Sequence, residues 1–189
     1  ARLAACDTLA ALSALVVEQG GRAALFGDGN PAARVMVVGD MPSADDSAAG
    51  RLFAGPAGQL LDRMLAAIGR DRADTYLVNL LAAPTAGGRA PDAAAIAAAL
   101  PVVRRHIALV RPHAVLLLGG VTAAALLGVE SGIARLRGKW QTLTIDDQAI
   151  PALPSFAPAY LLAQPAHKAL AWHDLQLFRS ALAAHAAAS

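Results

Sequence analysis

An acidic and an aromatic residue stand in two loops that follow one apolar segment. Residues 35–38 read Val-Met-Val-Val and end at Gly39, a pattern typical of a strand buried on both faces of a parallel sheet. Asp40 follows at once, and Phe53 lies between glycines in the loop of residues 50–58. In open α/β sheets, ligands bind at the carboxyl ends of the strands. The two side chains therefore predict a ligand pocket at that edge.

The elements that position this pocket are apolar strand-like segments alternating with helical ones. This alternation predicts an α/β fold: a three-layer α/β/α sandwich with a mostly parallel central sheet of about four strands, built as a single domain over residues 1–189. The expected strands are 34–38, 75–80 and 114–118, with 138–145 and 149–153 forming either a hairpin that turns at Asp146-Asp147 or a strand and its connector. The expected helices are 7–19, 59–68, 92–110, a short one ending at 127, and 165–186.

Composition excludes several classes of site. The 189 residues are 56% hydrophobic, enough to bury a sizeable core. Cys6 is the single cysteine, which excludes an internal disulfide, a cysteine-based zinc site and a cluster held by this chain's thiolates alone. Gly-x-Gly-x-x-Gly and Gly-Lys-Ser/Thr motifs are absent, and no serine has a nucleophile elbow. With neither a signal peptide nor a membrane-spanning segment expected, we predict a cytoplasmic protein without a membrane partner.

Four segments, in this order and spacing, resemble the bacterial family 4 uracil-DNA glycosylases. They read LFGDGNPAARVMVVGDMPS, GRLFAGPAGQLLDRMLAAIG, TYLVNLLAAP and PSFAPAYLL. The resemblance covers about residues 9–182, and its most specific parts are the glycine-acid-x-proline loop and the GR-x-F-x-G-x-AGQLLD block. It implies the fold of that superfamily and DNA as the partner, whereas the formal charge of +2 by itself only permits nucleic-acid binding.

The resemblance assigns roles to the pocket residues. Asp40 takes the place of the acid that polarises a water at the anomeric carbon of the sugar or stabilises the oxocarbenium-like cation. Phe53 matches the aromatic residue that stacks on a flipped uracil, and Asn79 matches the asparagine whose amide pairs with the uracil edge. Gly39 and Met41, on either side of the acid, are expected to line the base pocket. Considered singly, these side chains also fit a turn or helix cap, a core position and a strand end.

The chain departs from the family pattern at the pocket. Ala157 stands where the family has a histidine that hydrogen-bonds the departing uracil anion, and loss of one such donor commonly costs about 100- to 1000-fold in rate. Asp40 is one methylene shorter than the family's glutamate, and a retreat of roughly 1 Å costs on the order of 100-fold unless the backbone compensates. Ser43 replaces the second glycine of the loop.

The family's iron–sulfur cluster is also expected to be missing. Its four cysteine positions fall at Leu12, Leu15, Ala83 and Ala99, all of them apolar. We therefore predict no cofactor and no metal, with the two leucines packing against the two alanines where the cluster would lie.

Further contacts to DNA are expected from loops near the pocket. For Tyr160 and Leu161, the opening of the last helix explains the sequence equally well, and the arginines fit scattered solvated charges. The expected contacts are Ala157, Pro158, Tyr160, Leu161, Arg51 and Arg137.

Two functions from different classes fit the sequence. The first is a divergent uracil-DNA glycosylase-like enzyme of base excision repair, which hydrolyses the N-glycosidic bond of a flipped, deaminated base in single- or double-stranded DNA, with reduced or altered activity. The second is a non-catalytic DNA-binding or protein-interaction module that keeps the glycosylase fold. The acid, aromatic and asparagine favour the first, and Ala157 favours the second.

Overall fold

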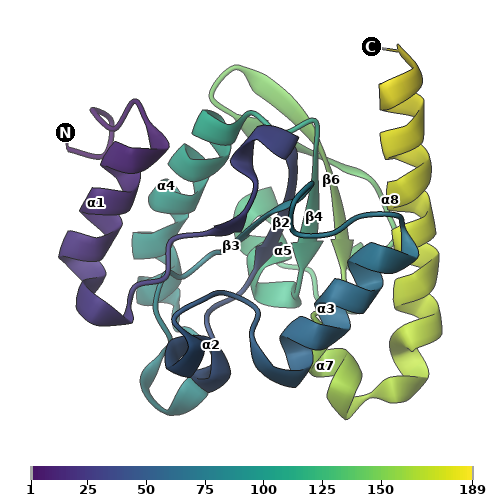
Figure 1. Ribbon diagram of the computed structural model, residues 1–189, viewed down its shortest axis with the longest axis horizontal. Coiled ribbons are helices and arrows are strands. Elements are labelled where there is room, and N and C mark those ends of the chain that lie inside the picture. Colours follow the sequence, from purple (N-terminus) through teal and green to yellow (C-terminus); the bar gives the residue numbers. More distant parts are fainter. Residues whose placement is uncertain (1, 189) are drawn as a thin grey trace.

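A computed structural model describes residues 2–188 of the chain, which form a six-stranded sheet with helices on both faces (Figure 1). The strand order is β1-β3-β2-β4-β6-β5. The strands are β1 Asp28–Gly29, β2 Val35–Gly39, β3 Tyr76–Asn79, β4 Ala114–Leu118, β5 Gln141–Ile145 and β6 Gln148–Ser155. The α-helices are α1 Leu9–Gly20, α2 Ala44–Ala49, α3 Gly55–Ala67, α4 Ala93–Val110, α5 Gly120–Leu127, α6 Ile133–Leu136, α7 Pro158–Ala163 and α8 Lys168–Ala188. Short 3-10 helices span Gly21–Ala23, Pro31–Ala33, Ala86–Gly88 and Pro165–His167.

The sheet confirms the predicted α/β class but has more strands than the four expected. Its four central strands run parallel, and β1 and β5 are antiparallel edge strands. The hairpin alternative is correct, because β5 and β6 pair with Ile145 opposite Gln148. The two-residue strand β1 was not predicted, since so short a segment has no alternating pattern to detect.

The register of the parallel strands decides which side chains meet at the carboxyl edge. Gly39 of β2 pairs with Asn79 of β3. On the other side of β2, β4 pairs with β6, and Leu118 lies opposite Ser155. The loops that leave β2, β3, β4 and β6 therefore open on the same edge.

Each face of the sheet packs a separate apolar layer. One layer joins the sheet to α4 and α5, and the other joins it to α3, α7 and α8 (Figure 1). Helix α1 packs against α4 at the outside of the first layer. By length and composition α4 could cross a membrane, a test that core helices also pass. Here Arg104 and Arg105 donate to the carbonyl oxygens of Thr144 and Cys6, and the buried side of α4 covers the sheet.

Local capping explains where the helices begin. Helix α4 begins after Asp92, whose side chain accepts from the amide of Ala95, as predicted. Helix α3 begins at Gly55, four residues before the predicted start, because Pro56 suits the first turn. The predicted terminal helix, 165–186, begins as a 3-10 turn at Pro165–His167 and continues as α8, and α7 lies before it as a separate helix that was not predicted.

Candidate active site

Asp40 lies directly beyond β2, with its carboxylate against the start of α5. Its Oδ1 accepts from the amide of Thr122 at 2.9 Å and from the Thr122 hydroxyl at 2.7 Å. Burial raises the pKa of Asp40, and the two hydrogen bonds from Thr122 oppose that rise in pKa. The carboxylate is thus held at the sheet edge and also caps α5 from outside the helix, which is the cap role that the sequence left open.

Phe53 and Asn79 meet over the backbone of Gly39. A carbon placed at the Cβ position of Gly39 would lie 2.5 Å from Asn79 Oδ1 and 2.9 Å from Phe53 Cζ. No larger residue fits at Gly39 unless these side chains move, because real Cβ atoms do not approach other heavy atoms that closely. The glycine at the end of β2 thereby brings the aromatic ring and the amide together.

Asn79 has an unsatisfied amide. It is 8% exposed, and its Nδ2 and Oδ1 have no hydrogen-bond partner among residues 2–188. Buried polar groups without partners cost about 1–3 kcal/mol each, so such a group calls for an explanation. The strand-end explanation, in which the side chain satisfies the local backbone, is therefore wrong for Asn79.

Arg72 holds Phe53 in a left-handed backbone conformation. Phe53 has φ of 52°, a region that costs a non-glycine residue roughly 1 kcal/mol. The Arg72 guanidinium donates from Nη1 to the carbonyl oxygen of Leu52 at 2.8 Å and from Nη2 to that of Phe53 at 2.5 Å. Nη1 also bonds to Asp28, and Nε bonds to Asp62. The ring of Phe53 is half-buried and packs on the layer below, rather than lying fully in the core.

Asp46 joins the two loops of the site and was not predicted. Its Oδ2 accepts from the amide of Ser43 at 3.0 Å, and its Oδ1 from the amide of Ala54 at 2.7 Å. Ser43 in turn caps α2 and accepts from the amide of Asp46, which completes a capping box. The Ser-x-x-Asp spacing was the available signal in the sequence. Ser43, where the family pattern predicts a glycine, therefore serves as the N-cap of α2.

One cavity of about 240 Å³ opens between these loops. Asp40, Phe53 and Asn79 line it together, as do the other two predicted base-pocket residues, Gly39 and Met41. The remaining wall is largely apolar and is formed by Pro42, Ser43, Asp46, Ala54, Ala57, Leu118, Ala157, Pro158 and Ala159. Ala157, which the resemblance predicts to match the family's histidine, lines the cavity and brings no side-chain donor.

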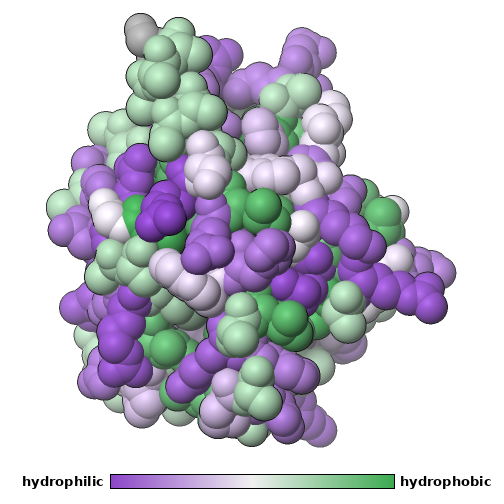
Figure 2. All heavy atoms as spheres, turned by 90° about the vertical axis from the view of Figure 1, so that its right-hand side faces the viewer, coloured by the Kyte–Doolittle hydropathy of each residue, from purple (hydrophilic) through white to green (hydrophobic). Residues whose placement is uncertain are grey.

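The structure separates the residues predicted to contact DNA into two groups. Ala157 and Pro158 line the cavity, Tyr160 is exposed, and Arg51 is exposed with its guanidinium 3.5 Å from Asp28. Leu161 is corrected: it is 1% exposed and belongs to the core beneath α7. On the face that carries α8, the most hydrophobic residues (dark green) form small groups separated by hydrophilic ones, and weakly hydrophobic residues (pale green) gather at the top (Figure 2).

The prediction that Arg137 contacts DNA is wrong as well, because its guanidinium pairs with a buried carboxylate of the protein. Its Nε donates to Oδ2 of Asp174 at 3.0 Å, and Nη2 donates to Oδ1 of the same carboxylate. Asp174 is fully buried and also accepts from the hydroxyl of Ser155 at 2.7 Å. Ser155 ends β6, two residues before Ala157, so this group anchors one wall of the cavity.

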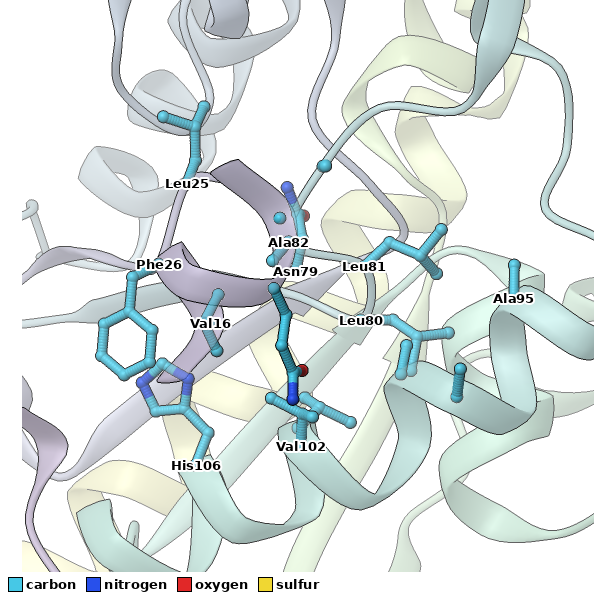
Figure 3. Close-up of a pocket in the computed structure, with 16 residues that line it drawn as sticks. Val16, Leu25, Phe26, Asn79, Leu80, Leu81, Ala82, Ala95, Val102 and His106 are labelled. Atoms are coloured by element: carbon cyan, nitrogen blue, oxygen red, sulfur yellow. The ribbon is translucent and has the colours of Figure 1, made fainter. Parts of the chain in front are cut away.

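A second cavity, of about 260 Å³, lies on the other side of Asn79 (Figure 3). Its lining is mostly aliphatic and includes Ala83 and Ala99, and Phe26 and His106 stack at its wall with ring centroids 4.1 Å apart. Ala83 and Ala99 are two of the four positions that the resemblance predicts for the ligands of the family's cluster.

The residues present do not fit an iron–sulfur cluster. Leu12 and Leu15 form a small apolar group with Cys6, behind Val102 and Phe26, and do not line the second cavity. The predicted packing of the leucines directly against the alanines is therefore corrected. No group of three or more His, Cys, Asp or Glu side chains suited to a metal occurs among the described residues. Thiolates are the ligands such clusters require, and this wall offers aliphatic carbon instead.

Comparison with known proteins decides the family. The model of the uracil DNA glycosylase superfamily matches residues 26–176. The chain belongs to this superfamily. It is 32% identical to the type-4 uracil-DNA glycosylase of Saccharolobus solfataricus over 165 residues, which is 84% of this chain and 76% of that protein. The type-4 uracil-DNA glycosylase of Pyrobaculum aerophilum is 30% identical over 159 residues, 82% of this chain and 81% of that protein. That of Thermotoga maritima is 29% identical over 139 residues, 73% and 71% of the two chains.

Proposed function

We propose that this protein is a DNA glycosylase that hydrolyses the N-glycosidic bond of a deaminated base flipped out of DNA. The observation that carries the proposal is the amide of Asn79, which has no hydrogen-bond partner in the described part of the chain and is buried beside an aromatic ring and a carboxylate in one cavity. An amide both donates and accepts, and the edge of uracil presents both an N–H and carbonyl oxygens. A bound base would satisfy both Asn79 atoms.

Phe53 supplies the face on which a flipped base stacks. Base–aromatic stacking is worth about 1–3 kcal/mol, and the left-handed backbone at Phe53 is a strain that the contacts of Arg72 maintain. Stacking alone tolerates any base, so the choice of base falls to the Asn79 amide.

Asp40 supplies the negative charge. As a carboxylate it stabilises positive charge developing on the sugar and accepts a proton from the attacking water. The water oxygen forms the new bond to the anomeric carbon, the C–N bond breaks, and its electron pair leaves with the base. The absence of a donor at Ala157 leaves the departing anion to Asn79 and solvent, which supports a slow enzyme or one that prefers another deaminated base.

A cleavage assay tests this function. Oligonucleotides containing uracil, hypoxanthine or xanthine, single-stranded and paired, are incubated with the wild type, Asp40→Asn, Asn79→Asp and a surface control, Asp147→Asn. We expect abasic-site formation by the wild type and the control, and a loss of about 100-fold or more in Asp40→Asn. Cleavage that persists at full rate without the Asp40 carboxylate would exclude the proposed mechanism.

The second candidate function is a DNA-binding module without catalysis. It is favoured by the hydrogen bonds of Asp40, which cap α5, and by the missing donor at Ala157. Binding of the same oligonucleotides by the wild type with no cleavage of any of them would establish it.

A further inference from the structure

Thr122 is the residue that holds the Asp40 carboxylate. It is fully buried in the first turn of α5, and its amide and hydroxyl both bond to the same carboxylate oxygen, Oδ1. Oδ2 accepts neither of these bonds. The result is a carboxylate with one oxygen fixed on a helix and the other left for a reactant.

The hydroxyl proton of Thr122 has two acceptors within reach. Its Oγ1 lies 2.7 Å from Asp40 Oδ1 and 2.8 Å from the carbonyl oxygen of Gly39. That carbonyl already accepts from the amide of Leu80 at 2.8 Å. Since a hydrogen bond to an ionised group is the stronger one, the hydroxyl donates to Asp40 whenever Asp40 is charged.

The backbone before Thr122 is built for this close approach. A carbon at the Cβ position of Gly119 would lie 2.5 Å from Asp40 Oδ2 and 2.8 Å from Oδ1, and φ at Gly119 is +111°. Only a glycine lets the carboxylate lie this close to the start of the helix. The amide groups at that end of α5 also favour the negative form of Asp40.

Few other charges act on Asp40. The other titratable side chain that lines the cavity is Asp46, which is held by the amides of Ser43 and Ala54. Helix α5 and strands β4 and β6 carry no titratable residue, and α7 carries Tyr160 alone. Thr122 therefore provides the main polar contact that sets the state of Asp40.

We propose that Thr122 is a positioning residue for Asp40, keeping the carboxylate ionised and oriented for attack at the sugar. The proposal rests on the proposed glycosylase function and adds a residue to it. If Asp40 served only as a cap for α5, the Thr122 hydroxyl would affect stability without affecting the pH dependence of the reaction.

The test compares Thr122→Val, Thr122→Ser and an exposed control, Thr142→Val, in single-turnover cleavage across pH. Valine keeps the shape and the backbone amide but removes the hydroxyl. We expect Thr122→Val to cut the rate at least about 10-fold, to move the acidic limb of the profile to higher pH, and to leave unchanged the enzyme concentration that gives the half-maximal rate. Thr122→Ser and the control should match the wild type. A wild-type profile in Thr122→Val would overturn the proposal.

A second measurement separates this proposal from the proposed function. Carbon-13 NMR of the Asp40 carboxyl group follows its titration without any substrate. The pKa of Asp40 should rise in Thr122→Val, because the carboxylate loses a hydrogen bond, and should be unchanged in Thr122→Ser. An unchanged titration in Thr122→Val overturns the role of Thr122, whereas a shifted titration in a protein that never cleaves DNA overturns only the glycosylase function.

Discussion

Arg72 donates a hydrogen bond from Nη2 to the carbonyl oxygen of Phe53, nineteen residues earlier in the chain, at 2.5 Å. The same guanidinium bonds to the carbonyl of Leu52 and to the carboxylates of Asp28 and Asp62. The position of the aromatic ring in the cavity thus depends on an arginine that lies in another loop and does not line that cavity.

Replacing Arg72 by alanine should release this loop. Without the bonds to the two carbonyls, Phe53 leaves its left-handed conformation and the stacking face is lost. We expect at least about 10-fold weaker binding of base-modified DNA, the scale of one lost stacking contact. We also expect a loss of about 1–3 kcal/mol in the free energy of unfolding.

Arg70→Ala is the matched control for this change. Arg70 is near in sequence, and its guanidinium bonds to the carboxylate and the carbonyl oxygen of Asp74 rather than to Leu52 or Phe53. DNA titrations and urea unfolding of both variants provide the comparison. Equal DNA affinity in Arg72→Ala and the wild type would show that the loop keeps its shape without the arginine.

A histidine at position 157 should raise the rate of base release. Ala157 lines the cavity and brings no donor. An imidazole there would hydrogen-bond the departing anion and raise the cleavage rate by up to about 100-fold. Ala159→His adds a histidine to the same wall and serves as the control. The measurement is single-turnover cleavage of uracil-containing DNA. If both variants cleave at the wild-type rate, position 157 does not face the departing base.

The stability of the fold should fall as the pH drops from 6.5 toward 4, because the folded protein keeps His106 neutral while the unfolded chain binds a proton there. His106 is buried, its Nε2 lies 2.9 Å from the Tyr76 hydroxyl, and burial lowers its pKa from 6.5 to about 4. The unfolded chain therefore binds a proton at a higher pH than the folded chain. The stabilisation is fully present above pH 6.5 and declines as the pH falls toward 4. Its full size is about 3 kcal/mol.

Urea unfolding at pH 7 and at pH 5 measures this effect. His106→Gln, which keeps an acceptor for Tyr76 and does not titrate, should lose less stability between the two pH values than the wild type. His173→Gln, an exposed histidine of α8, should behave as the wild type does. An equal loss in His106→Gln would assign the acid sensitivity to other groups.

The purified protein should contain no iron–sulfur cluster. With aliphatic side chains at Leu12, Leu15, Ala83 and Ala99, the ligand set for a cluster does not exist in this chain. We expect no visible absorbance band and no stoichiometric iron after anaerobic purification, and Cys6→Ala should not change either result. Iron that copurifies at a fixed ratio to protein would contradict the prediction.

Patterns of two kinds made much of the fold predictable. The buried strand β4 was predicted with its observed bounds, because a short apolar run between turn residues has few other interpretations. Helix α4 was predicted from its Asp92 cap. The short helices α2 and α6 were not predicted, since four to six residues give too little periodicity to detect.

The site was predictable where its residues lie close in sequence to the strand ends. Asp40 follows β2, Asn79 ends β3, and Phe53 lies in a loop between glycines. The structure brings all three side chains to one cavity. Arg72, Asp46 and Thr122 were missed, because each acts through a backbone or carboxylate group that only folding brings near. Arg137 and Leu161 were wrongly predicted to contact DNA, because both lie close in sequence to the site. In the folded protein Arg137 binds the buried Asp174, and Leu161 is buried in the core.

The sequence by itself determined the family, the parallel sheet and the chemical types in the pocket, since these follow from local patterns and motifs. It also determined that the thiolates for a cluster and a histidine at position 157 are absent. Only the tertiary structure decided how the pocket residues are held. Within residues 2–188 the Asn79 amide has no hydrogen-bond partner, the Phe53 backbone is held by Arg72, and the Asp40 carboxylate is bound at one oxygen by Thr122. Those relations join residues that are far apart in the chain, and no local pattern encodes them.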